Sequence, residues 1–323
     1  MRIGLMGCEH VHSGAYTELL KAMPEAEFAG CYDGDQELGR GFAAQHGISF
    51  YDQRDAFLQA VDAAVICSAN ARHREMAVAA AEAKKHVLVE KPIATTIEDA
   101  QIMIDACEKN KVKLMVAFPV RYIPAVIRAK EMIDSGALGA VTAIAGTNHG
   151  RMPGGWFVDK ALSGGGSVMD HTVHLADIMH WILKSDIHDV FCRMDTKIYN
   201  IDVEDCGLIS LGFENGTYAT IDCSWNRPKA MPAWGDVTMQ IIGTKGTIDL
   251  DALKQHGILY SNKEQYSRYI PWGSDSDALM LKGFIRCVTE DLPSPITGED
   301  GLFALKVALM AYKSAESHTV VTA

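Results

Sequence analysis

The first third of the chain alternates short apolar runs with longer amphipathic segments. Continuous apolar runs of this length predict buried strands, and the amphipathic segments predict helices. The predicted strands are 2–6, 27–32, 63–68, 86–89 and 112–118. The predicted helices are 15–23, 38–46, 73–84 and 96–110. Strands that alternate with helices indicate an α/β fold, a doubly wound parallel sheet of the Rossmann type.

The pattern changes beyond Gly139, where strands dominate and Asn215-Gly216 predicts a hairpin turn. The predicted strands are 141–147, 190–198, 207–213, 218–225, 237–242, 247–250 and 257–260. The predicted helices are 124–135, 164–184, 277–290 and 301–317. We therefore expect an α+β domain with a mostly antiparallel open sheet. The expected domains are 1–120, which binds nucleotide, and 121–323, which binds substrate and forms oligomers.

An open sheet that carries helices on one face needs a cover for the other face. We expect that uncovered face to include apolar residues that suit a symmetric partner. The candidates are Ile209, Leu211, Ile221, Met239 and Ile241. The expected assembly is a homodimer or homotetramer formed through this sheet.

Composition narrows the class of protein. A chain of 323 residues, 48 % of them hydrophobic, can bury the cores of two domains. The net charge of −11 argues against a nucleic-acid partner. No apolar run approaches the roughly 20 residues of a membrane span, and the N-terminal apolar segment is too short for a signal peptide. Eight scattered cysteines without a C-x-x-C pair indicate reduced thiols in a cytoplasmic protein.

In a parallel sheet the ligand binds at the carboxyl ends of the strands. Here those ends are 7–12, 33, 68–73, 90–92 and 118–121. The cofactor-binding residues predicted from them are Gly7, Cys8, Glu9, His10, Val11, Asp33, Ser68, Ala69, Asn70, His73, Glu90, Lys91 and Arg121.

The turn after the first strand is the place for a dinucleotide fingerprint, G-x-G-x-x-G. Gly7 fits its first position, but Glu9 and His12 replace the second and third glycines. A pyrophosphate could still bind the N–H groups at the helix N-terminus. Glu9 would repel it unless its side chain points away.

Asp33 follows 21 residues after His12, at the end of the second strand, where a carboxylate accepts hydrogen bonds from the adenosine ribose. Because no arginine follows it directly to hold a 2′-phosphate, we favour NAD over NADP. The alternative interpretation of Asp33-Gly34-Asp35 is a surface turn.

A second chemical motif is Gly164-Gly165-Gly166, followed by Asp170 and His174. Residues four apart share one face of a helix, so this carboxylate and imidazole could transfer a proton behind a glycine loop. The alternative is a buried helix in which the two side chains satisfy each other.

These motifs together resemble the glucose–fructose oxidoreductase/inositol dehydrogenase (Gfo/Idh/MocA) family over nearly the whole chain. The matching segments are 3–8, Asp33, Ser68-Ala69-Asn70 with His73, Glu90-Lys91-Pro92, Arg121-Tyr122 with Pro124, 164–174, 243–246 and 297–301. The resemblance implies an NAD(P)-dependent dehydrogenase of sugars or polyols. It also implies that Lys91 lies between nicotinamide and substrate, and that Asp170 and His174 are catalytic.

The sequence departs from the family pattern at three places. Two fingerprint glycines are missing, Phe118-Pro119 replace polar residues, and the segment 148–157 is not a general family feature. These departures mark a subgroup.

The chemistry of the three candidate catalytic residues fits such a reaction. Removing hydride from a secondary alcohol also requires a base for its O–H proton, and His174 qualifies. Asp170 could orient that ring or bind a neighbouring hydroxyl, and Lys91 could stabilise a developing alkoxide.

Aromatic faces and imidazoles in the second half suit a sugar. We expect His149, Trp156, His171 and Trp225 to bind substrate, with Arg227 and Trp234 as further wall candidates. A zinc site formed by His149, Asp170, His171 and His174 is the less favoured alternative, and we predict no metal.

Three functions fit this set of residues. The first is hydride transfer between NAD(P) and a hydroxyl or keto group of a sugar or polyol. The second is redox-neutral, NAD-dependent cleavage of a glycoside. The third is a nucleotide-sensing regulator without turnover, against which the combined retention of Lys91, Asp170 and His174 argues.

Overall fold

The protein is described by a computed structural model that covers residues 1–263, 265–271 and 273–323. The chain divides into two compact units. Unit 1 comprises Met1–Pro119, Ala161–Gly164 and Asp277–Leu305. Unit 2 comprises Val120–Lys160, Gly165–Ser276 and Lys306–Ala323.

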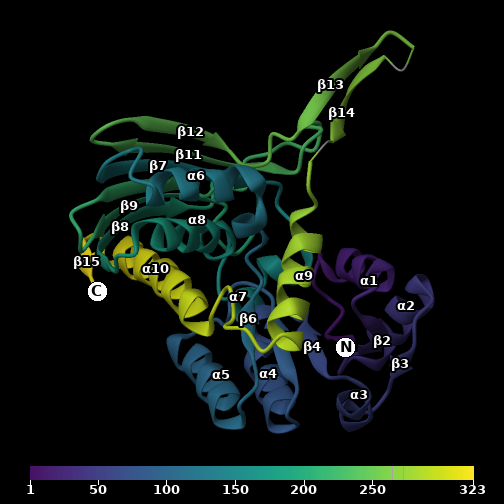
Figure 1. Ribbon diagram of the computed structural model, residues 1–323. Helices are drawn as coiled ribbons and strands as arrows, with labels where there is room; N and C mark the ends of the chain where they lie inside the picture. The colour runs from purple at the N-terminus through teal and green to yellow at the C-terminus, as the bar shows by residue number, and fades with distance from the viewer. Residues whose placement is uncertain (264, 272) are drawn as a thin grey trace. The chain divides into compact units, whose positions relative to one another are not determined.

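Unit 1 is built on a six-stranded parallel sheet with the strand order β3-β2-β1-β4-β5-β6 (Figure 1). The strands are β1 (Arg2–Met6), β2 (Glu27–Tyr32), β3 (Phe50–Tyr51), β4 (Ala63–Ile66), β5 (His86–Val89) and β6 (Leu114–Val116). Leu5, Ile66 and Leu88 are fully buried, as expected for strands covered on both faces. The predicted Rossmann-type sheet is therefore confirmed.

Helices connect these strands. They are α1 (Ser13–Ala22), α2 (Gln36–His46), α3 (Arg54–Ala60), α4 (His73–Glu82) and α5 (Ile97–Asn110). Asp35 caps α2 by accepting hydrogen bonds from the backbone N–H groups of Glu37 and Leu38. The short β3 and α3 were not predicted, because two residues and seven residues are too few to establish a strand or a helix periodicity.

The carboxyl-terminal part of the chain also contributes to unit 1. We expected a single boundary at residue 120, but 277–305, with α9 (Ser276–Thr289) and the start of α10 (Gly298–Ser317), belongs to unit 1. Two contacts give the reason. The N–H of Val116 donates to the carbonyl of Ile296 at 3.2 Å, and Lys113 pairs with Asp291 at 2.8 Å.

Unit 2 is built on a seven-stranded sheet with the order β12-β11-β7-β10-β9-β8-β15. The strands are β7 (Val141–Gly150), β8 (Ile187–Asp195), β9 (Cys206–Phe213), β10 (Tyr218–Asp222), β11 (Gly235–Gly243), β12 (Thr247–Asp251) and β15 (Val321–Thr322). β7 and β10 run parallel and the other neighbours antiparallel, which confirms the predicted sheet type. β13 (His256–Ser261) and β14 (Tyr266–Pro271) form a separate hairpin (Figure 1).

The strand predicted over 190–198 is displaced toward the N-terminus. β8 ends at Asp195 because the next residues form a turn around Asp205. The carboxylate of Asp205 accepts hydrogen bonds from the N–H groups of Lys197, Ile198 and Tyr199 at 2.7–2.9 Å. These donors are therefore not available to a strand ladder.

The remaining helices of unit 2 are α6 (Pro124–Asp134) and α8 (Ser167–Leu183), and α7 (Lys160–Ser163) lies at the unit boundary. α8 packs on β7, β9 and β10, and its residues Val173, Leu175 and Ile178 are fully buried. No helix in the described part of the chain is long and apolar enough to cross a membrane.

The uncovered face of this sheet is not the one expected from the sequence. The five apolar residues assigned to it, from Ile209 to Ile241, are at most 1 % exposed and form the core. Side chains alternate between the two faces of a strand, so the neighbouring positions point to solvent. Leu208 and Tyr218 are 59 % and 64 % exposed there. The prediction for the five residues was wrong because they alternate with polar, exposed positions such as Ser210, Thr220 and Gln240, and such alternation marks the apolar set as the covered face.

A buried ion pair joins the start of unit 2 to α8. Nε and Nη2 of Arg121 donate to the two carboxylate oxygens of Asp177 at 2.7 and 2.6 Å. Both side chains are nearly inaccessible, and the guanidinium lies 5.3 Å from the centre of the Trp181 ring. This paired geometry fixes the helix that carries Asp170 and His174.

Asp177→Asn should lower the free energy of unfolding by about 3–5 kcal/mol, because it leaves the Arg121 charge buried without its counter-ion. Urea unfolding followed by tryptophan fluorescence measures this loss, since all five tryptophans lie within residues 156–272. Glu131→Gln, which breaks the exposed Arg128–Glu131 pair, is the matched control and should change little. Equal losses in the two variants would contradict the role of the buried pair.

Candidate functional site

The first turn of unit 1 is held by Asp33. Its carboxylate accepts hydrogen bonds from the N–H of Cys8 at 2.7 Å and of Asp35 at 2.8 Å. Asp33 is 3 % exposed, and burial raises its pKa although both backbone bonds oppose that shift. Gly7 has φ +86°, and an added Cβ would lie 2.8 Å from the Ser68 nitrogen, so the turn requires glycine here.

Glu9 has partners from the segment that follows β4. Its Oε1 accepts a hydrogen bond from the N–H of Ala69 at 2.7 Å and pairs with Arg72 at 3.0 Å. Arg72 therefore offsets the charge that would repel a pyrophosphate. The sequence contained this partner, but nothing in the spacing connected residue 9 with residue 72.

A pocket of about 380 Å³ lies beside Asp33. Its lining residues are Met6, Tyr32, Asp33, Gly34, Asp35, Arg54, Arg72, Glu75 and Met76. Arg54 and Arg72 thus line the same pocket as Asp33, although neither follows it directly in the sequence. Because an arginine near this carboxylate can hold a 2′-phosphate, the sequence argument for NAD over NADP is weakened.

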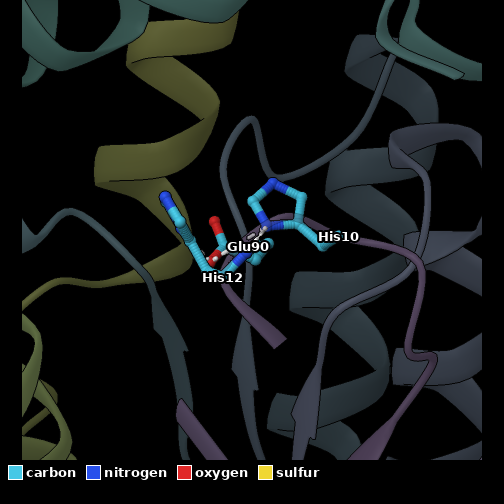
Figure 2. Close-up of side chains that lie close together, drawn as sticks. All are labelled: His10, His12 and Glu90. Carbon is cyan, nitrogen blue, oxygen red and sulfur yellow. Dashed lines mark hydrogen bonds and ion pairs between the residues drawn. The ribbon is translucent and has the colours of Figure 1, made fainter. Parts of the chain in front are cut away.

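His10, His12 and Glu90 converge at the carboxyl ends of β1 and β5 (Figure 2). Nδ1 of His12 lies 2.9 Å from Oε1 of Glu90, and Nδ1 of His10 lies 3.7 Å from the same oxygen. The His10 and Glu90 side chains are 1 % exposed, whereas His12 is 34 % exposed. Val11 between the two histidines is 61 % exposed.

Burial and charge set the protonation of this cluster. Burial lowers the pKa of His10 to about 3, so its ring is neutral. Burial also acts to lower the pKa of His12, but the charge and hydrogen bond of Glu90 raise it above its ordinary value. Burial acts to raise the pKa of Glu90, but the two histidines and Lys91 hold it well below the usual range.

Lys91 follows Glu90 and is itself 5 % exposed, and the Lys91–Pro92 peptide is cis. The ring of His73 holds this loop through contacts with backbone oxygens. Its Nδ1 lies 3.0 Å from the carbonyl oxygen of Pro92, and its Nε2 lies 3.2 Å from that of Ser68. Both ring nitrogens thus face backbone oxygens, which assigns His73 a positioning role.

The other residues expected at the cofactor also contact backbone. Nδ2 of Asn70 donates to the carbonyl of Ser163 at 2.8 Å, and Oγ of Ser68 donates to the carbonyl of Ala69 at 3.2 Å. Ser68 and Asn70 are buried. The structure therefore brings together, within unit 1, all predicted cofactor residues except Arg121, which belongs to unit 2 and pairs with Asp177.

In unit 2, a carboxylate from a distant segment caps α8. Oε1 of Glu204 accepts hydrogen bonds from the N–H groups of Gly166 at 2.8 Å and Val168 at 3.0 Å, and from the hydroxyl of Tyr312 at 2.6 Å. A Cβ at Gly166 would lie 2.0 Å from the Glu204 carbonyl oxygen, so the glycine permits this approach. The sequence gives no local signal for Glu204 as the cap, because 38 residues separate it from Gly166.

Asp170 and His174 lie on α8, and each is 7 % exposed. Nε1 of the fully buried Trp225 donates to Oδ2 of Asp170 at 3.1 Å, and Nε2 of His171 lies 3.2 Å from the same oxygen. His171 packs edge-on against Trp225 and Trp234. Asp170 is therefore held by Trp225 and His171.

The other residues expected at the substrate have different surroundings. Nδ1 and Nε2 of His149 lie 3.1 Å from carboxylate oxygens of Asp236 and Asp222, and Arg227 pairs with Asp236. Trp156 stacks on Phe157, with ring centroids 3.9 Å apart. In the residues that the structure describes, metal-ligand geometry is found at His10, His12 and Glu90, not at the set containing His149 and His174.

Comparison with known proteins places these features in one family. Residues 1–118 match the sequence model of the "oxidoreductase family, NAD-binding Rossmann fold", and residues 126–249 match the "GFO/IDH/MocA C-terminal domain". Myo-inositol 2-dehydrogenase from Thermotoga maritima is 28 % identical over 98 % of this chain and 96 % of that protein.

Two further relatives bear on the cofactor. D-xylose 1-dehydrogenase [NADP(+)] from Haloarcula marismortui is 26 % identical over 86 % of this chain and 79 % of that protein. The crystal structure of GenD2 from gentamicin A biosynthesis in complex with NAD has a TM-score of 0.89 and 25 % identity, covering 100 % of this chain and 96 % of that one. With both family models matched along its length, the chain belongs to the GFO/IDH/MocA family of oxidoreductases.

Proposed function

We propose that the protein transfers hydride between NAD and a hydroxyl or keto group of a sugar or polyol. The observation that carries the proposal is the buried Asp170 and His174 pair on α8, in a chain whose other unit is an NAD-binding Rossmann fold. The indole N–H of Trp225 fixes Asp170, and His174 lies four residues further along α8, so the two side chains share one face of the helix. A carboxylate and an imidazole on one face of a helix can transfer a proton.

The residues of unit 1 fit a dinucleotide despite the missing glycines. The turn at Gly7 keeps its positive φ, Asp33 holds it, and Arg72 offsets the charge of Glu9. The N-terminus of α1 begins at Ser13 after this turn, with the orientation that favours an anion. Asp33 supports NAD, and the NAD complex of GenD2 agrees with that choice.

Each candidate residue has a defined task in this proposal. NAD, when bound, accepts or supplies the hydride. His174 takes the hydroxyl proton during oxidation and returns it during reduction, because an imidazole exchanges protons near neutral pH. Lys91 donates to the substrate oxygen and stabilises the alkoxide that forms as the proton leaves. Asp170, held by Trp225, orients the base or a neighbouring hydroxyl.

The substrate class is inferred from the relatives and from the side chains of unit 2. The relatives are named as dehydrogenases of inositol and xylose. Trp156, with one ring face on Phe157, could present its other face to the C–H surface of a sugar, whereas both ring nitrogens of His149 already lie against carboxylates. The enzyme would act in the cytoplasm as a homo-oligomer, with Leu208 and Tyr218 on the open sheet face available to a second copy.

Lys91→Ala should lower turnover by about 100- to 1,000-fold, because the alkoxide loses its charged donor. The Kd for NAD⁺ should change only a few-fold. Turnover is measured by nicotinamide absorbance with inositols and aldoses as substrates, and Kd by calorimetry. Lys84→Ala removes an exposed lysine of the same unit and should have no effect on either quantity. Full turnover in Lys91→Ala would overturn the role assigned to Lys91.

Asp33→Ala should weaken NAD⁺ about 10- to 100-fold, the loss expected for hydrogen bonds to a charged group. It should weaken NADP⁺ less, since the same change removes a negative charge that repels a 2′-phosphate. Calorimetric titration with NAD⁺, NADH, NADP⁺ and NADPH, after removal of any copurified nucleotide, gives these affinities. Equal losses for both cofactors would mean that Asp33 acts only by holding the turn at Cys8.

A further inference from the structure

We propose that His10, His12 and Glu90 form a binding site for a divalent transition-metal ion of the zinc class. Their side chains point toward one another from the turn after β1 and from the end of β5 (Figure 2). His10 and Glu90 are also among the predicted cofactor-binding residues, so the metal site is proposed for the protein without nucleotide, and its test does not require turnover.

The spacing of the candidate ligand atoms suits one ion. The three atoms all lie within 4.8 Å of one another. In a tetrahedral zinc site with bonds of 2.0–2.1 Å, two ligand atoms are about 3.3 Å apart. The 2.9 Å from His12 to Glu90 and the 3.7 Å from His10 to Glu90 fall on either side of that value. Side-chain shifts of less than about 1 Å would complete the geometry.

The lone pairs have the required orientation. Nδ1 of His10 accepts the N–H of His12 at 3.2 Å, so this nitrogen carries no proton, and an ion would take over the lone pair that this bond engages. A hydrogen bond of that length is at the weak end of the range. Oε1 of Glu90 and Nδ1 of His12 share one proton, which the ion would replace. Oε2 of Glu90 accepts the N–H of Lys91 at 3.1 Å, which leaves Oε1 for the ion.

The backbone that carries these ligands is already fixed. The N–H of His10 donates to the Cys67 carbonyl at 3.1 Å, and that of Glu90 donates to the Ile66 carbonyl at 3.1 Å. A preformed site needs little ordering on binding. The partial exposure of His12 provides an entry path, while His10 and Glu90 are shielded from water.

The donor set selects the class of metal. Imidazole ligands suit zinc, copper, iron and nickel, whereas magnesium and calcium prefer oxygen ligands. Three protein ligands leave a coordination position for water or another oxygen ligand, as in catalytic zinc sites. The neighbouring Lys91 charge opposes a cation, so we expect weaker binding than at a structural zinc site with four ligands.

Cobalt(II) is the probe of choice because its visible absorption reports coordination number. The full-length protein, treated with EDTA and dialysed, should show a strong visible band that saturates at one equivalent of Co²⁺. Zn²⁺ should remove the band, and Mg²⁺ should not. A spectrum that stays as weak as that of aqueous Co²⁺ would overturn the proposal.

The variants His10→Gln and His12→Gln should each weaken Co²⁺ binding about tenfold or more. His46→Gln is the matched control and should bind as the wild type does. His46 lies in the same unit, and its Nδ1 lies 3.0 Å from Oε1 of Glu18, almost the distance of the His12–Glu90 pair. If both cluster variants bound Co²⁺ as tightly as the wild type does, the ion would bind at other residues and the proposed site would be wrong.

A crystal of the wild-type protein grown with Zn²⁺ gives a test that does not depend on the folding of variants. Anomalous scattering at the zinc edge should place the ion within bonding distance of His10, His12 and Glu90. A peak only at other residues, or no peak, would overturn the site.

Discussion

Buried carboxylates need partners, and this requirement organises the strand ends of unit 1. An ionised carboxylate withdrawn from water is costly unless hydrogen bonds or opposite charges compensate it. Asp33 accepts hydrogen bonds from two backbone N–H groups, Glu9 is compensated by Ala69 and Arg72, and Glu90 by His12 and Lys91. Each compensation fixes one loop that follows a strand. The three loops are the ones that a bound dinucleotide would contact.

In unit 2 as well, buried carboxylates with polar partners fix the elements that carry candidate site residues. Glu204 caps α8, Asp177 holds Arg121, and Asp170 receives the indole N–H of Trp225. Two of these acids lie on α8 itself, so one helix is fixed along its length by polar contacts as well as by apolar packing. A helix held in this way can present an imidazole at a constant position.

The sequence predicted the architecture well because both sheets follow simple periodic patterns. Buried strands such as 86–89 are continuous apolar runs, and Asn215-Gly216 is a strong turn signal. The predicted cofactor residues other than Arg121 lie in unit 1, and Asp170, His171 and His174 lie on α8. The failures have a common cause. Arg54, Arg72, Glu204 and Asp205 act on residues far away in the sequence, and no local pattern encodes such partners. The covered face of the second sheet was misassigned because its apolar residues were taken to be the surface that meets a partner, although exposed polar residues such as Ser210, Thr220 and Gln240 alternate with them.

The discontinuity of unit 1 has a consequence for synthesis on the ribosome. In the edge strand β6 the N–H of Val116 donates to the carbonyl of Ile296, and Lys113 is paired with Asp291. These partners are translated about 180 residues later, so the first 119 residues emerge without the segment that completes their packing. The nascent unit 1 therefore carries an incomplete edge while nearly all of unit 2 is made, and its packing is completed only after residues 277–305 have been translated.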